Sequence, residues 1–464
     1  MKKSYFVLTL VLVAATLVLA ACPSGVTQDT VATVAAVATQ AAPAVNSIAT
    51  QAAPVVEQAA TAVSGAVDAA NTAMCTACTD PKGCVTLKAG DPLNIAWLFV
   101  VEGADASLGT DTKRGAEIAQ SDRPEVAGHK VELIGENEGC NAEGGQAAGT
   151  KIASNPNVVA AIGTNCSSAA RAAIPLLYAA GIPMVSPSNT APDLTADDRP
   201  VEYSWYMRTA HNDKVQGAAM AQYAVEKGFK TAATIHDGSL YADKLQQVFA
   251  EKFKELGGTV AAQEATDPNE TNMGPMLTRI AAVKPDFIYL PIFIAAGGQI
   301  TSQAKQNADL AKVQLAGADG IFSPDFLKAA GDASLGFLWS SPDFSAFGSG
   351  YQDFLKKHQE KYGEAVLAPF HAHSYDAYNL IANAIEKVAV NCGDGSTVIA
   401  RTALRDAMIG TQNMTGLTGN LTCTATGDCA DPKIAVYEAV SADAATWNPG
   451  AAADSNPKKI WPNN

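Results

Sequence analysis

The stretch VVAAIGTNCSS at residues 158–168 decides the fold of this chain. Its first five residues are all apolar, which is typical of a strand buried in a parallel sheet. A helical pattern follows from Ser167 to about residue 180, and a short run, Pro183–Val185, has the character of a second strand. Strand, helix and strand in this order predict a βαβ unit with a right-handed crossover.

The same alternation continues in both directions along the chain. Further strands are predicted at residues 93–101, 130–135, 231–235, 258–263, 286–290 and 312–317. Further helices are predicted at residues 111–120, 143–154, 239–256, 272–282 and 296–306. This is too long for one sheet, and the break near Met207–Asp213 predicts a crossing between two lobes. We therefore expect an α/β fold of two doubly wound parallel-sheet lobes joined by a hinge, with a ligand cleft between them.

Small polar side chains follow two of the predicted strands. Ser167 and Ser168 open a helix, and the free N–H groups of a helix N-terminus favour a carboxylate or a phosphate. The alternative is ordinary capping of the helix by serine. The run Ser186–Thr190 contains two further serines, an asparagine and a threonine. It predicts either a second part of an anion site or a plain turn.

Five separated motifs resemble the leucine/isoleucine/valine-binding protein family. They are Ile162–Thr195, Arg208–Gly217, Ile235–Tyr241, Gly317–Gly320 and Tyr375–Ala377. The members of this family are type I periplasmic binding proteins of branched-chain amino acid ABC importers. The resemblance covers about residues 90–440 and implies the two-lobed fold that the strand pattern predicts.

The resemblance also implies which residues bind the ligand. Ser167, Ser188 and Thr190 would hold an α-carboxylate, and Asp319 would hold the α-ammonium from the opposite lobe. The aromatic residues that would line the rest of the cleft are Tyr241, Phe293 and Phe370. A buried zwitterion needs charge-assisted hydrogen bonds at both of its charges, which this division would supply. No catalytic residue, metal or cofactor is expected.

Two histidines, His371 and His373, flank Phe370, and a leucine-type cleft does not need them. Each is expected to pack against its neighbours or to face solvent. If one of them pointed into the cleft, the ligand could carry a polar or acidic side chain.

The N-terminus has the pattern of an export signal. Lys2 and Lys3 precede an apolar run, Tyr5–Ala21, and Leu-Ala-Ala-Cys at 19–22 resembles a lipobox with Cys22 as the acylated residue. The alternative is a retained transmembrane anchor, for which the run is short. Residues 23–74 are rich in Ala, Val, Thr and Gln and predict a spacer, or alternatively a weak coiled-coil stalk.

Without Cys22, eight cysteines remain, and an even number in an exported chain predicts disulfides. The resemblance implies a Cys140–Cys166 bridge, and the short loop between Cys423 and Cys429 predicts another. The other four allow three pairings, of which Cys78–Cys84 is favoured, with Cys75–Cys392 by elimination. A zinc site at Cys75, Cys78 and Cys84 is the alternative, but no histidine lies nearby in the sequence.

The expected domain boundaries follow from these features. In chain order they are a signal peptide at 1–21, the lipidated cysteine and tether at 22–74, a Cys-containing segment at 75–91, lobe 1 at 92–209 and 340–405, lobe 2 at 210–339 and 406–445, and a C-terminal tail at 446–464.

The expected function is that of an extracytoplasmic, lipid-anchored solute-binding protein of an ABC importer, with a branched-chain or related amino acid as ligand. Its expected partners are the permease subunits and, through the lipid, the membrane, and the protein is expected to be a monomer. A net charge of −14 without a basic cluster argues against nucleic-acid binding.

Three alternatives stay open at this point. The protein could be a ligand-sensing surface lipoprotein of the same fold. It could bind a ligand other than an amino acid, such as a small amide. It could also be a hydrolase that uses Ser167, although no Gly-x-Ser-x-Gly motif surrounds this serine.

Overall fold

The computed structural model describes residues 71–450 and 455–462. The expected signal peptide, Cys22 and residues 22–70 of the expected tether lie outside the described residues. The chain divides into two units, residues 1–73 and 74–464, and the fold below is that of the second unit.

Lobe 1 is built on a six-stranded sheet that is parallel except at one edge. In spatial order its strands are β3 (Glu125–Val126), β4 (His129–Asn137), β2 (Leu93–Phe99), β5 (Val158–Gly163), β6 (Met184–Ser186) and β7 (Tyr206–Arg208). Only β3 pairs antiparallel, with β4. Every residue of β5 is buried, as its unbroken apolar run predicts for a central strand.

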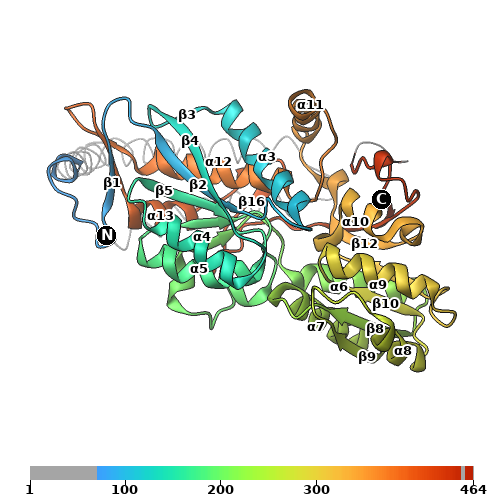
Figure 1. The fold of residues 1–464 in the computed structure, drawn as a ribbon. Helices are drawn as coiled ribbons and strands as arrows, with labels where there is room; N and C mark the ends of the chain where they lie inside the picture. The colour runs from blue at the N-terminus through green and yellow to red at the C-terminus, as the bar shows by residue number, and fades with distance from the viewer. Residues whose placement is uncertain (1–70, 451–454, 463–464) are drawn as a thin grey trace, which may run out of the picture. The chain divides into compact units, whose positions relative to one another are not determined.

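Helices cover both faces of this sheet (Figure 1). Helices α4 (Ala142–Ala153) and α5 (Ser167–Ala179) pack together on one face. Helix α3 (Ala106–Asp122) packs on the other face against α12 (His371–Val388), which comes from much later in the chain. At the α4–α5 contact, a Cβ on Gly145 would lie 2.4 Å from the carbonyl oxygen of Ala169. Glycine at this position therefore allows α4 to approach α5 closely.

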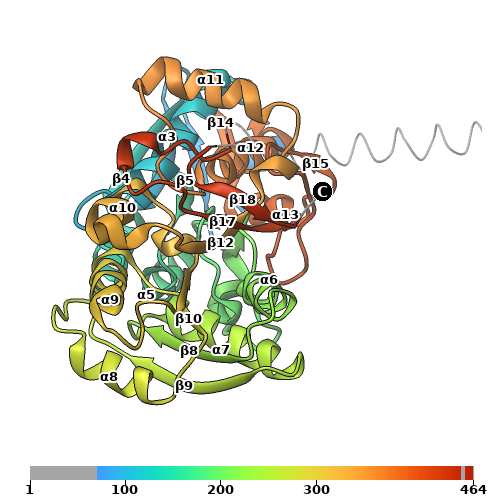
Figure 2. The ribbon, with the colours of Figure 1, turned by 90° about the vertical axis from the view of Figure 1, so that its right-hand side faces the viewer.

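Lobe 2 has a seven-stranded sheet. Its order is β18 (Lys458–Trp461), β17 (Ile434–Glu438), β12 (Leu338–Pro342), β11 (Gln314–Gly317), β10 (Phe287–Leu290), β8 (Thr231–His236) and β9 (Thr259–Ala265). The pairings of β17 are antiparallel and the others are parallel. Helices α6 (Asp213–Glu226) and α7 (Leu240–Glu255) lie on one side, and α8 (Gly274–Ala282) and α9 (Ile294–Gln306) on the other (Figure 2). Helix α10 (Pro324–Ala330) packs against α9.

The later part of the chain differs from the expected boundaries in three places. Strand β12 at 338–342 belongs to lobe 2, although lobe 1 was expected to resume at residue 340. Helix α13 (Arg401–Ile409) packs on α12 of lobe 1, beyond the expected limit at residue 405. The expected C-terminal tail returns to lobe 2 as β18, where the Trp461 ring packs against Tyr223 and its Nε1 donates to Glu226 Oε2 at 2.8 Å.

The remaining elements form a small separate sheet or lie in the crossings between the lobes. Strand β1 (Cys84–Leu87) pairs antiparallel with β14 (Thr397–Ala400), which also pairs with β13 (Val390–Asn391). Helix α11 (Tyr351–Tyr362) lies in the second crossing between the lobes, and the hairpin β15–β16 (Met414–Thr415 and Asn420–Leu421) lies in the third. No helix in the described ranges is long and apolar enough to cross a membrane.

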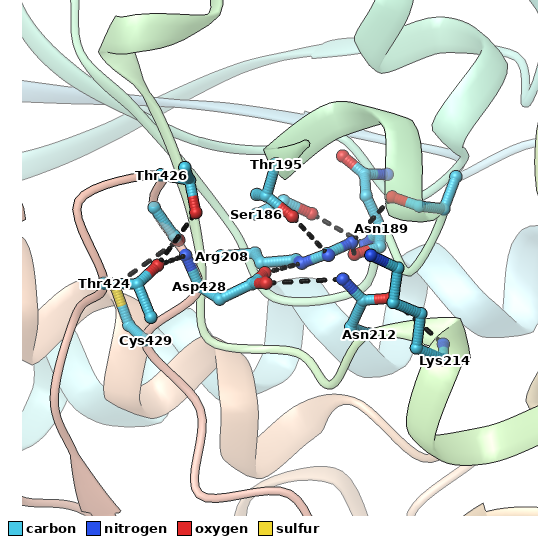
Figure 3. Close-up of polar contacts among 12 residues, drawn as sticks. Ser186, Asn189, Thr195, Arg208, Asn212, Lys214, Thr424, Thr426, Asp428 and Cys429 are labelled. Carbon is cyan, nitrogen blue, oxygen red and sulfur yellow. Dashed lines mark hydrogen bonds and ion pairs between the residues drawn. The ribbon is translucent and has the colours of Figure 1, made fainter. Parts of the chain in front are cut away.

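The crossing after β7 is anchored by a fully buried arginine. Arg208 Nε donates to Asp428 Oδ1 at 2.5 Å, and Arg208 Nη2 donates to Thr195 Oγ1 at 2.7 Å (Figure 3). Arg208 Nη1 donates to Ala191 O at 2.9 Å. Burial disfavours the charge of Asp428, but Arg208, together with hydrogen bonds from Asn212 and Thr195, outweighs burial and holds the pKa of that carboxyl below its usual range. Arg208 therefore fixes the loop after β6 that carries Ser188 and Thr190.

The sulfur atoms of the eight described cysteines lie at bonding distance in four pairs. The pairs are Cys75–Cys392, Cys78–Cys84, Cys140–Cys166 and Cys423–Cys429, the same four that the sequence led us to expect. Within the part of the chain that is described, no group of three or more His, Cys, Asp or Glu side chains could hold a metal ion.

Candidate ligand-binding cleft

A small cavity lies where the two lobes face each other at the carboxyl ends of their strands. Its lining residues are Leu108, Asn165, Ser167, Ser188, Tyr241, Phe293, Asp319, Gly320 and Phe370. All of the expected ligand-binding residues except Thr190 are among them. This space has room for about one water molecule. The cleft must therefore open before a larger ligand can enter.

Hydrogen bonds across the cleft show that the lobes are closed. They run from Leu240 N to Ser168 Oγ at 3.1 Å, from Ile294 N to Asp105 Oδ1 at 3.1 Å, and from Ser323 Oγ to Ser107 Oγ at 2.9 Å. The Asp105 carboxyl lies at one of these contacts between the lobes. Burial raises its pKa to about 6, against the lowering effect of the Ile294 N–H, and the charge of Asp237 raises it further.

The wall from lobe 1 is made of neutral hydrogen-bonding groups. Helix α5 begins at Ser167, and its N-cap residue, Cys166, makes no side-chain capping bond. The Ser167 hydroxyl therefore does not cap the helix. Its oxygen accepts a hydrogen bond from Ala191 N at 3.3 Å, which leaves its proton free to donate into the cavity. The N–H groups of the first turn of α5 add further donors.

Ser188 is placed differently from Ser167, although both line the cavity. The Ser188 hydroxyl donates to Asn165 O at 3.0 Å, so its proton is already in use. Asn165 was not singled out from the sequence. Its side chain accepts from Val100 N and donates to Thr112 Oγ1 at 2.8 Å, and so it ties the end of β5 to β2 and α3.

Thr190 is buried beside the cavity but does not line it. Its carbonyl oxygen accepts a hydrogen bond from Asp213 N at 2.9 Å, at the start of α6. The structure thus places Thr190 where it connects the loop after β6 to the first residue of lobe 2.

Behind the first turn of α5 lies Glu138, which is fully buried. Burial raises the pKa of its carboxyl to about 8, although backbone N–H groups, including that of Cys166 at 3.2 Å from Oε1, act to lower it. A carboxyl with this pKa is mostly protonated at neutral pH. It therefore leaves the positive end of the helix available to an anionic ligand.

The wall from lobe 2 contains a buried acid. Asp319 begins η3 (Asp319–Ile321), which is separated from β11 by Ala318. Its Oδ1 accepts from the Tyr241 hydroxyl at 2.5 Å and from Gly320 N at 3.0 Å. Burial, followed by the charge of Asp319, raises the pKa of Tyr241 well above its usual value, so Tyr241 keeps its proton and donates it. Asp319 Oδ2 has no hydrogen-bond partner among the described residues.

The rest of the cavity wall is apolar. Leu108, Phe293 and Phe370 supply it, and the Phe293 ring lies 5.2 Å from that of Tyr241. Phe293 is also the N-cap residue of α9, so a lobe 2 helix sets its position. An aliphatic or aromatic group fits such a surface, because it offers no hydrogen-bond partner to satisfy.

His371 and His373 are both buried, and neither lines the cavity. His371 Nδ1 lies 3.0 Å from Asp111 Oδ2, and its Nε2 lies 2.8 Å from the Tyr351 hydroxyl. His373 packs edge-on against Phe370, and burial, helped by His211 and His371, lowers its pKa well below the usual value. Both histidines therefore pack against their neighbours, as expected, and neither points into the cavity.

Comparison with known proteins identifies the family of this chain. A family model described as periplasmic binding protein matches residues 92–444. A leucine-, isoleucine-, valine-, threonine- and alanine-binding protein of Pseudomonas aeruginosa is 27% identical over 360 residues, which cover 75% of this chain and 90% of that protein. These similar proteins are binding proteins and not enzymes, and the family's name places them outside the cytoplasm.

Solved structures share the fold. A leucine-binding protein of Thermotoga maritima is 26% identical, with a TM-score of 0.68 over 75% of this chain and 96% of that one. A solute-binding protein of R. palustris in complex with benzoate is 20% identical, with a TM-score of 0.63 over 75% of this chain and 93% of that one. The prediction of two doubly wound α/β lobes is confirmed, and the chain belongs to the periplasmic binding protein family.

Proposed function

We propose that the protein captures an amino acid with an apolar side chain and delivers it to an ABC importer. The observation that carries this proposal is the opposition of two walls in one closed cavity. Ser167 and the start of α5 offer donors for a carboxylate, and Asp319 offers a buried carboxylate with one free oxygen for an ammonium. Leu108, Phe293 and Phe370 leave an apolar surface for the side chain.

Asp319 also argues against an aromatic carboxylate as ligand. A benzoate-like molecule could use the donors of lobe 1, but its ring would lie against a buried acid that gains no positive partner. Leaving a charge buried and unpaired costs several kcal/mol, so the site favours a ligand that brings its own cation.

Calorimetry on the full-length chain, purified in detergent, tests this proposal. The ligands are leucine, isoleucine, valine, threonine and alanine, with benzoate as the matched carboxylate without an ammonium. We expect saturable binding of at least one of the amino acids and none of benzoate. Binding of benzoate with no amino acid bound would contradict the proposal.

The proposal includes export and anchoring. Cys22 would carry the lipid, residues 22–74 would form the tether, and the four cysteine pairs would be disulfides, as an exported chain allows. Two acyl chains are enough for stable attachment to a membrane.

Substitution of the acylated cysteine tests the anchor. Cys22→Ser removes the thiol that would carry the lipid, and we expect the variant to move from the membrane fraction to the soluble fraction. Fractionation followed by immunoblotting measures this. A variant that stays with the membrane would show instead that the apolar run Tyr5–Ala21 is a retained anchor.

A further inference from the structure

We propose that His211 is a positioning residue for the ligand's ammonium group, and that its second proton sets the acid limit of ligand binding. This inference rests on the proposed function, because it concerns how the same site holds the amine. His211 lies in the crossing between β7 and α6, and it faces the one Asp319 oxygen that is free to bind a cation.

The geometry fixes the neutral tautomer of this histidine. His211 Nε2 lies 2.8 Å from Gln216 Oε1 and 3.4 Å from Asp319 Oδ2. The Gln216 amide nitrogen donates to Ser340 O at 3.0 Å, so Gln216 Oε1 must be an acceptor. The proton of neutral His211 is therefore on Nε2, where it faces both Gln216 and Asp319.

The ring is held in place on its other side as well. It stacks on Phe370, with ring centroids 6.1 Å apart and an interplanar angle of 24°. His211 is buried, and its Nδ1 has no hydrogen-bond partner in the described part of the chain. The histidine thus links the crossing between the lobes, the apolar wall and the acid of the cavity.

The charged and titratable groups that face His211 are Asp319 in η3, Asp213 in α6 and His373 in α12. Asp213 is fully buried, and burial, followed by the charge of Asp319, raises its pKa to about 7. The cluster is therefore acidic when His211 is neutral. A ligand ammonium would supply the missing positive charge.

Protonation of His211 would change this balance. An imidazolium beside Asp319 is a second cation at the same carboxylate, and it repels an ammonium in the cavity. Ligand binding and the second proton of His211 therefore oppose each other. By linkage, binding of the ligand weakens binding of this proton, and binding of this proton weakens binding of the ligand by the same factor.

Two substitutions of His211 separate the effect of its N–H donor from the effect of its second proton. His211→Gln places an amide N–H within reach of Gln216 and Asp319 but does not titrate. His211→Ala removes both properties. Asp213→Asn serves as the control for the neighbouring acid, because it removes the carboxyl whose pKa burial raises to about 7 and leaves His211 in place.

The test is the dissociation constant for leucine between pH 5.5 and 7.5, measured by calorimetry on the full-length chain and the three variants. For the wild-type protein we expect binding to weaken by about tenfold for each pH unit below the midpoint of the titration. His211→Gln should bind within about threefold of wild type at pH 7.5 and lose this dependence. His211→Ala should bind at least about tenfold more weakly at pH 7.5, the effect of one lost polar contact to a charged group. Asp213→Asn should keep the pH dependence.

Two results would overturn the inference. One is an unchanged pH profile in His211→Gln, and the other is a loss of the profile in Asp213→Asn alone. If His211→Ala does not fold, the pH dependence of leucine binding by His211→Gln still tests the inference. A wild-type protein that binds none of the five amino acids would contradict the proposed function instead, so the two failures can be told apart.

Discussion

The two walls of the cavity differ in chemistry and in construction. Lobe 1 presents neutral donors, namely the Ser167 hydroxyl and the first turn of α5, whereas lobe 2 presents the Asp319 carboxylate, which is oriented by Tyr241. Each wall therefore satisfies only one end of a zwitterion. A ligand that contacts both walls stabilises the closed state through its greater affinity for that state, which is how a ligand can drive closure.

The difference in construction predicts where a substitution does the most damage. The donors of lobe 1 are partly backbone groups, which no side-chain substitution removes. The acid of lobe 2 is the single side chain of Asp319, whose Oδ2 accepts no hydrogen bond from the described residues. We therefore expect affinity to depend more on Asp319 than on any hydroxyl of lobe 1.

Substitution of Asp319 should have the largest effect. Asp319→Ala leaves the ligand's ammonium buried without a partner, which costs about 3–5 kcal/mol, or at least about a hundredfold in affinity for leucine. Calorimetry at pH 7.5 measures the loss. Asp319→Asn is the matched control, because it keeps the shape and the hydrogen bond from Tyr241 but not the charge, and it should also bind weakly. Near-normal affinity in Asp319→Ala would refute the assignment of the ammonium to lobe 2.

The two serines of lobe 1 allow a sharper comparison with an intermediate effect. Ser167→Ala removes a free donor to the carboxylate, and a hydrogen bond to a charged group contributes about 1.5–3 kcal/mol, so affinity should fall by about 10- to 100-fold. Ser188→Ala removes a hydroxyl that already donates to Asn165 O, so its effect should be smaller. Equal losses in the two variants would show that Ser188 turns its proton to the ligand during binding.

The sequence predicted most of the fold because the signals that determine it are local. Each buried parallel strand is a short apolar run, as in β5, and each crossover helix follows it within a few residues. Strand β18 escaped prediction because its place in the sheet depends on contacts of Trp461 with α6, which is more than 200 residues earlier in the chain. No local pattern marks such a contact.

The cavity shows the same contrast between local and distant signals. Ser167 was predicted because it follows a strand, and parallel strands end at one edge of a sheet, whereas Asp319 was predicted because the family resemblance implies it. His211 could not be predicted, because it lies in the crossing between the lobes and reaches Asp319 only through the way α6 and η3 pack. Asn165 belongs to the stretch at residues 158–168, but its hydrogen bonds to Val100 and Thr112 depend on the three-dimensional packing and have no local sequence signal.

The smallest effect that we expect comes from Asp105, which lies at the edge of the cleft and belongs to neither wall. Its pKa of about 6 in this closed structure lies above the usual value near 4. We expect opening to expose Asp105 to water and return its pKa toward the usual value, so the closed state should bind this proton more tightly than the open state. The resulting cost of closure is absent below about pH 4, grows as the pH rises toward 6, and is constant above it. Asp105→Asn still accepts from Ile294 N but carries no charge, so at pH 7.5 it should bind leucine as tightly as the wild type or a few-fold more tightly.

The matched variant for this position is Asp105→Ala, which removes the acceptor as well as the charge. It leaves the N–H of Ile294 without its partner across the cleft, and so it should bind leucine less tightly than Asp105→Asn. Calorimetry at pH 7.5 on the two variants compares them directly. Weaker binding by Asp105→Asn than by the wild type would mean that the charge of Asp105, attracted to the positive end of α9, contributes more to closure than its burial costs.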